Sequence, residues 1–125
     1  MSLDVFLQAF RDGDAAPSDH AAIAAILTPF IVTREASFAS LKTADGEADC
    51  YGLGSDSLTI NNASGRIIWD IVVKVAKEAN LAIMPAGCAV CIVDQSARNH
   101  LPPELQDDVI YVRSGADLLN VIHGS

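Results

Sequence analysis

The segment from Ser64 to Asn80 constrains the fold most, because its pattern predicts a helix with very little polar surface. Its polar residues recur with a helical period and form one narrow stripe, while most of the remaining positions are apolar, including Trp69. The stripe consists of Arg66, Asp70, Lys74, Lys77 and Glu78. Such a helix must be covered on most of its circumference, so we expect it to be the central packing element of the chain.

Strand and helix signals surround this central helix. Strands are predicted at Leu3–Phe10, Leu58–Asn61, Leu81–Met84, Ala89–Val93 and Val109–Val112. A helix capped by Ser18 or Asp19 should end near Pro29, and a capping box at Ser114 opens a last helix through Ile122, with Gly124 past its end. The short segment Leu101–Leu105 predicts a helical turn. Together these elements predict a single α+β domain over residues 1–125, with a mixed, mostly antiparallel sheet and about three helices packed on it.

A hairpin is the clearest local signal in the sequence. Asp45-Gly46 lies between two strand-like runs and is a preferred two-residue hairpin loop. This loop pairs Leu41 with Cys50 and Lys42 with Asp49, so apolar and oppositely charged side chains meet across the strands. In that register Cys50 faces the core.

The charge balance narrows the choice of partners. The chain has 16 acidic and 8 basic residues, a formal net charge of −8. Phosphates repel such a surface, so nucleic acid is not expected as a partner, whereas a basic protein would be attracted. The alternative is that the charge serves solubility. A structural homo-oligomer sealed by the apolar surface around Trp69 is a further alternative.

The expected cellular location rests on two kinds of segment, signal peptides and membrane spans. The N-terminus has no signal-peptide pattern, and no apolar run approaches the length of a membrane span, so no membrane association is expected. Three cysteines without a signal peptide predict reduced thiols and a cytoplasmic protein.

The hairpin also supplies a candidate binding surface. No Lys or Arg lies between Lys42 and Arg66, and Glu47, Asp49 and Tyr51 share the outward face if Cys50 faces the core. An acidic and aromatic surface of this kind is typical of protein recognition. The candidate binding residues are Asp45, Glu47, Asp49, Tyr51 and Asp56. The alternative is a solvated hairpin whose charges prevent edge-to-edge aggregation.

Cys88 and Cys91 form the most chemical-looking motif, a Cys-x-x-Cys. With His100 the pair gives an alternative interpretation, a small thiol-dependent enzyme or a metal-binding protein. A structural zinc site needs four ligands, and no second Cys pair exists. In a strand the two sulfurs would point to opposite faces, so we expect both cysteines to pack in the core. We therefore expect no metal, no cofactor and no enzymatic activity.

Four blocks of the sequence carry a resemblance. They are Ser2–Phe10, Asn61-Asn62 ahead of Trp69-Asp70, Leu101-Pro102 and Val112–Ala116. With these blocks the chain resembles a set of small uncharacterised bacterial proteins. Small acidic bacterial proteins of this sort are often suspected to be immunity proteins against toxins. The resemblance therefore implies a non-enzymatic binding module, with an immunity protein as one form of it.

Overall fold

The computed structural model describes residues 3–124, in which nine strands form one mixed sheet. The strands are β1 (Val5–Arg11), β2 (Asp14–Ala16), β3 (Ile31–Glu35), β4 (Phe38–Lys42), β5 (Glu47–Tyr51), β6 (Ser57–Asn61), β7 (Ala82–Pro85), β8 (Val90–Ile92) and β9 (Val109–Tyr111). Their order across the sheet is β3-β4-β5-β6-β1-β7-β8-β9, and β2 pairs with the end of β1. Only β8 and β9 pair in parallel among these strands of residues 3–124. The predicted α+β fold with a mostly antiparallel sheet is confirmed.

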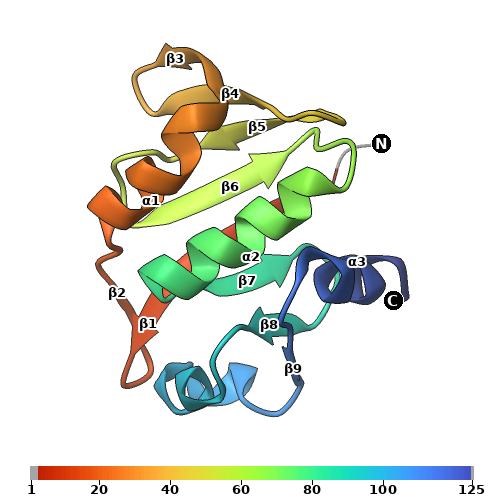
Figure 1. Ribbon diagram of the computed structural model, residues 1–125. Coiled ribbons are helices and arrows are strands. Elements are labelled where there is room, and N and C mark those ends of the chain that lie inside the picture. Colours follow the sequence, from red (N-terminus) through yellow and green to blue (C-terminus); the bar gives the residue numbers. More distant parts are fainter. Residues whose placement is uncertain (1–2, 125) are drawn as a thin grey trace.

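Three α-helices cover one face of this sheet (Figure 1). They are α1 (His20–Leu27), α2 (Ile67–Ala79) and α3 (Gly115–Gly124). The short 3-10 helix η1 (Thr28–Phe30) follows α1, and η2 (Gln95–His100) and η3 (Pro103–Leu105) lie between β8 and β9. Helix α2 packs against both α1 and α3. Across residues 3–124, every helix is too short or too polar to cross a membrane.

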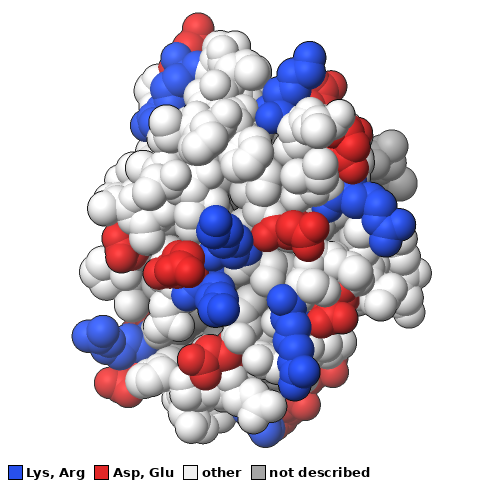
Figure 2. Space-filling view, viewed as in Figure 1, with Lys and Arg blue, Asp and Glu red and all other residues white. Residues whose placement is uncertain are grey.

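Helix α2 is the central packing element, as its sequence predicted. Trp69 is only 7% exposed and Ile68 is fully buried, and most other α2 residues are buried with them. Its exposed residues are the polar ones at positions 70, 74, 77 and 78. Figure 2 shows the helix-covered side of the molecule, where acidic and basic side chains alternate. The apolar surface around Trp69 is therefore covered within the chain.

The ends of the other helices follow local signals. The Asp19 carboxylate caps α1 by accepting a hydrogen bond of 3.0 Å from the Ala22 N–H, as predicted. The Ser114 hydroxyl oxygen accepts from the Asp117 N–H at 3.2 Å at the start of α3. The predicted end of α3 is wrong, because Gly124 lies inside the helix.

Two strands were not predicted. Strand β2 has only three residues, too few to show a period. Strand β3 is exposed at four of its five positions, so it has no buried alternation to reveal it. Both strands form because a neighbour offers backbone hydrogen bonds, β1 to β2 and β4 to β3.

The predicted hairpin exists, but its register is wrong by two residues. Lys42 pairs with Glu47 and Leu41 with Ala48, not with Asp49 and Cys50. The loop has four residues, closed by a hydrogen bond of 2.8 Å from the Thr43 N–H to the Gly46 carbonyl. A shift of two keeps every side chain on its predicted face, since side chains alternate with a period of two.

The hairpin loop contacts a segment that is distant in sequence, the residues ahead of α2. The Asp45 carboxylate accepts hydrogen bonds from the Thr43 hydroxyl at 3.0 Å and from the Arg66 N–H at 2.7 Å, ahead of α2. Gly46 lies so close to Ser64 that a Cβ at Gly46 would overlap the Ser64 carbonyl oxygen. In this loop the Asp45 carboxylate reaches the residue ahead of α2 and joins the hairpin to the helix.

The face of the sheet opposite the helices is covered only in part, and we name it the open face. Leu101 from the η2–η3 segment packs there on Ala82 and Ile92 in a second, smaller core. No described helix packs on the open face over β4, β5, β6 and the first half of β1. A candidate binding surface lies in this region.

Candidate binding surface

The alternation of β5 sets the candidate surface. Cys50 is fully buried on the helix side, whereas the neighbouring Tyr51 is 43% exposed on the open face. Glu47 and Asp49 share the face of Tyr51. The structure therefore brings together three of the predicted binding residues in the arrangement that the sequence predicted.

An aromatic row extends from Tyr51 across four strands. The Phe38 and Tyr51 rings have centroids 5.0 Å apart and are tilted by 53°. Tyr51 pairs with Thr59, which pairs with Phe6, and Phe6 is 41% exposed. We call Phe38, Tyr51 and Phe6 the aromatic row. The sequence analysis missed Phe6 and Phe38, although Phe6 alternates with the buried Val5 and Leu7 and so must face outward.

Carboxylates run beside the aromatic row. We call the four carboxylates beside the aromatic row the acidic border, and they belong to Asp4, Glu35, Glu47 and Asp49. Asp49 accepts a hydrogen bond of 2.8 Å from the Asn62 amide, and Asp4 accepts one of 3.3 Å from the Asn61 amide. These bonds hold two of the four carboxylates in place. Across from Glu47, the same face carries the ammonium group of Lys42.

The position of β5 bears on the alternative explanation for these charges. Charged side chains protect strands that lie at the edge of a sheet. Strand β5 lies between β4 and β6, and β4 is itself covered by β3. Glu47 and Asp49 are therefore not edge residues, and protection of an exposed edge does not explain them.

The other two predicted binding residues lie elsewhere. Asp45 caps the start of α2, and the hydrogen bond from the Arg66 N–H lowers the pKa of its carboxyl group. Asp56 lies in the turn before β6, where its carboxylate is 3.6 Å from the His20 imidazole at the start of α1. Asp45 thus has a structural role, and Asp56 lies at the other end of β5.

The structure places two residues of the thiol alternative, Cys91 and His100, on opposite sides of the sheet. Cys91 is fully buried on the helix side, and burial raises the pKa of its thiol to about 11, with a smaller contribution from Cys88. His100 packs on the opposite side of the sheet, where its Nδ1 accepts a hydrogen bond of 3.2 Å from the Asp12 N–H. The buried thiol and the imidazole do not meet, and a protonated thiol is a weak nucleophile.

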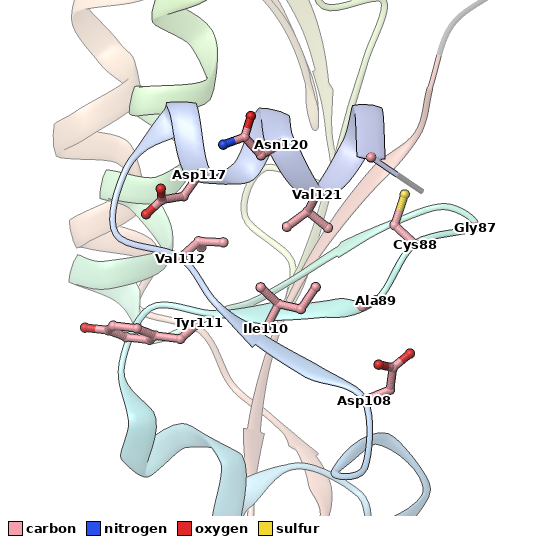
Figure 3. Close-up of a pocket in the computed structure, with 11 residues that line it drawn as sticks. Gly87, Cys88, Ala89, Asp108, Ile110, Tyr111, Val112, Asp117, Asn120 and Val121 are labelled. Carbon is pink, nitrogen blue, oxygen red and sulfur yellow. The ribbon is translucent and has the colours of Figure 1, made fainter.

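Cys88 differs from the prediction. It lies in the turn before β8, not in the strand, so strand alternation does not direct its sulfur away from Cys91. Instead Cys88 is partly exposed and lines an open hollow between β9 and α3 (Figure 3). Among residues 3–124, no group of three or more His, Cys, Asp and Glu side chains could hold a metal ion.

The fold defines a small α+β protein with three helices on one face of a mixed sheet and an acidic, aromatic patch on the other. Beyond that class, no family model matches the chain, and no curated protein and no solved structure is significantly similar to it.

Proposed function

We propose that this protein is a non-enzymatic binding module that holds a basic protein partner on its open face, as an immunity protein holds a toxin. The observation that carries the proposal is the contact of the exposed Tyr51 ring with the half-buried Phe38 ring, with Glu47 and Asp49 beside them on the same face. Rigid aromatic side chains are the commonest anchors of protein interfaces, and charges around them select the partner and speed its approach.

The charge of the open face favours a basic partner over a second copy of this chain. Two copies meeting face to face would bring two acidic borders together, with Lys42 on each face to offset only part of that charge. Like charges across an interface are repulsive, whereas Lys and Arg side chains of a different protein would pair with the carboxylates. Three cysteines, an odd number, also fit a reducing compartment, so we propose that the module works in the cytoplasm.

Matched baits test this proposal. The wild-type protein, the variant Tyr51→Ala/Glu47→Gln/Asp49→Asn and the control Val32→Ala, at an exposed position of β3, are used to capture proteins from a cell extract. We expect a basic protein that the wild type and the control retain and the open-face variant loses. Its affinity for the purified wild-type protein should fall when the salt concentration is raised from about 50 mM to about 500 mM, because salt screens the carboxylates.

The single variant Tyr51→Ala separates the aromatic contribution from the charge. We expect it to weaken binding of that purified partner by about 1–2 kcal/mol with little change in salt dependence. Equal capture by the wild type and the open-face variant, or binding indifferent to salt, would exclude the open face as the site.

A further inference from the structure

Strand β9 ends the sheet with one edge unpaired. It is the last strand in the sheet order, and no strand within residues 3–124 pairs with its outer side. The Val112 N–H donates to the Ile92 carbonyl of β8 at 2.9 Å. Backbone groups alternate in direction along a strand, so the N–H and C=O of Tyr111 point away from β8 and are open to another strand.

Each face of β9 borders a hollow. We call the one between β9 and α3 the helix-side hollow, which has a volume of about 700 Å³ and includes Ile110 and Val121 in its lining (Figure 3). The loop-side hollow, on the other face, has a volume of about 430 Å³. Val109 and Tyr111 line it, together with polar residues of η2 and of the segment before β9 that include the oppositely charged Arg98 and Asp107. A strand added to β9 would project alternate side chains into these two hollows.

The apolar residues of β9 are exposed on both faces. Ile110 is 39% exposed towards the helix side, and Tyr111 is 38% exposed. The Tyr111 ring is also held in place by the Arg113 guanidinium, 5.3 Å from the ring centroid. An added strand would cover both side chains, since neighbouring strands pack their side chains against each other on each face.

The helix-side hollow has the charge to select a side chain. Asp108 and Asp117 line it, and none of its lining residues within 3–124 is Lys, Arg or His. Figure 3 shows the two carboxylates at opposite ends of the hollow, with Ile110 and Val121 between them. A Lys or Arg side chain combines an aliphatic stem for the apolar centre with a cation for the carboxylates.

The opposite edge of the sheet has no such features in the described part of the chain. Strand β3 pairs irregularly with β4 at Val32, between Ile31 and Thr33, and it carries Arg34 and Glu35. An irregular, charged edge discourages the addition of a strand. The two edges therefore differ, and β9 is the edge that combines open backbone groups with hollows on both faces.

We propose that β9 takes up an extended peptide segment of another protein as an added strand, with a Lys or Arg side chain opposite Ile110 in the helix-side hollow. The backbone of the segment bonds to Tyr111, and its neighbouring side chains, small and uncharged, enter the loop-side hollow. This is the general mode in which main-chain hydrogen bonds supply affinity and alternating pockets supply specificity. The site is separate from the aromatic row and the acidic border, so either proposal can hold without the other.

A blocked peptide of alternating lysine and threonine is the probe. We expect saturable binding, with NMR shift changes at residues 108–112 and along α3. A matched peptide of alternating glutamate and threonine should bind at least about tenfold more weakly. Two N-methylated versions test the backbone, one methylated at the lysine amides and one at the threonine amides. Only one set of amides faces β9, so one version should lose binding and the other should keep it.

Protein variants place the site. Ile110→Lys should weaken binding at least about tenfold, because it puts a cation into the helix-side hollow. Val32→Lys makes the same change on the opposite edge and should leave binding unchanged. Asp108→Asn, at an exposed position, should weaken binding of the lysine peptide but not of the glutamate peptide. Circular dichroism and thermal unfolding establish that each variant is folded.

Several results would overturn the proposal. These are no binding at about 1 mM peptide, equal binding of both N-methylated versions, or shift changes confined to the aromatic row and the acidic border. Self-association of the wild-type protein that Ile110→Lys abolishes would show instead that a second copy of this chain covers β9.

Discussion

The Asp45 carboxylate, between β4 and β5, accepts a hydrogen bond of 2.7 Å from the backbone N–H of Arg66, the residue that precedes α2. The Ile67 N–H also points at this carboxylate, with 3.4 Å to each oxygen. The first turn of a helix leaves several N–H groups without partners, and a residue within the same segment usually supplies the cap. Here a residue that is distant in sequence does so, and it joins the hairpin to the central helix.

Replacing this cap should destabilise the protein. We expect Asp45→Ala to lower the Tm by several degrees, because the first turn of α2 loses its acceptor, and Asp45→Asn to lower it less, because an amide oxygen still accepts. The control Glu104→Ala removes an exposed carboxylate from η3 and should leave the Tm nearly unchanged. Equal melting of Asp45→Ala and the wild type would contradict the capping role.

The hydrogen bond between Asp45 and the Arg66 N–H should make the stability of the protein depend on pH. The hydrogen bond from the Arg66 N–H lowers the pKa of the Asp45 carboxyl group in the folded protein, so the charged form stabilises the fold. This stability is present above the ordinary aspartate pKa of about 3.9 and is lost as the pH falls through the lowered value. The Tm difference between the wild type and Asp45→Ala should therefore be constant above about pH 5 and shrink in more acidic solution. A difference that grows in acid would show the opposite sign.

Helix α3 packs on α2 through a residue without a side chain. The Gly115 N–H donates to the Asp70 carboxylate at 2.8 Å, and a Cβ at Gly115 would lie 2.5 Å from the Asp70 backbone nitrogen. We expect Gly115→Ala to lower the free energy of unfolding by about 1–3 kcal/mol, because α3 must move away from α2. Gly124→Ala is the matched control in the same helix, since a Cβ there meets nothing within 4 Å. Chemical denaturation measures both, and similar values would refute the close packing.

The three thiols should differ in reactivity. Burial raises the pKa of Cys50 to about 12 and that of Cys91 to about 11, and both side chains are fully buried. Cys88 is partly exposed. We therefore expect a thiol reagent to modify Cys88 quickly in the native protein and the other two only on unfolding. Cys88→Ser should remove the fast phase, and a fast phase that persists would mean that a buried thiol is accessible.

The buried thiols also affect alkaline stability. Their pKa values are raised in the folded state, so each contributes stability that is present below the unfolded pKa of about 8.5. That contribution is lost as the pH rises towards the folded values of about 11 and about 12. Stability should fall above about pH 9, and Cys50→Ala should fall less steeply. Parallel curves for the two proteins would argue against this cause.

The sequence by itself determined the elements whose period is strong. The polar stripe of α2 and the alternation around Cys50 each specify a buried and an exposed face. In both elements the structure has the faces that the sequence predicted. The outward positions of Glu47, Asp49 and Tyr51 were predictable for the same reason. Burial of apolar surface contributes most of the free energy that favours folding, and it leaves a periodic trace in the sequence.

Only the tertiary structure decided the features that depend on contacts between distant segments. The hairpin register depends on Asp45 reaching α2, and the aromatic row depends on which strands lie next to β5 and β1. The edge of β9 and its two hollows depend on α3 and η2 lying on either side of it. Backbone hydrogen bonds between strands are chemically alike at every position, so the sequence records that a strand forms but not which strand it will pair with.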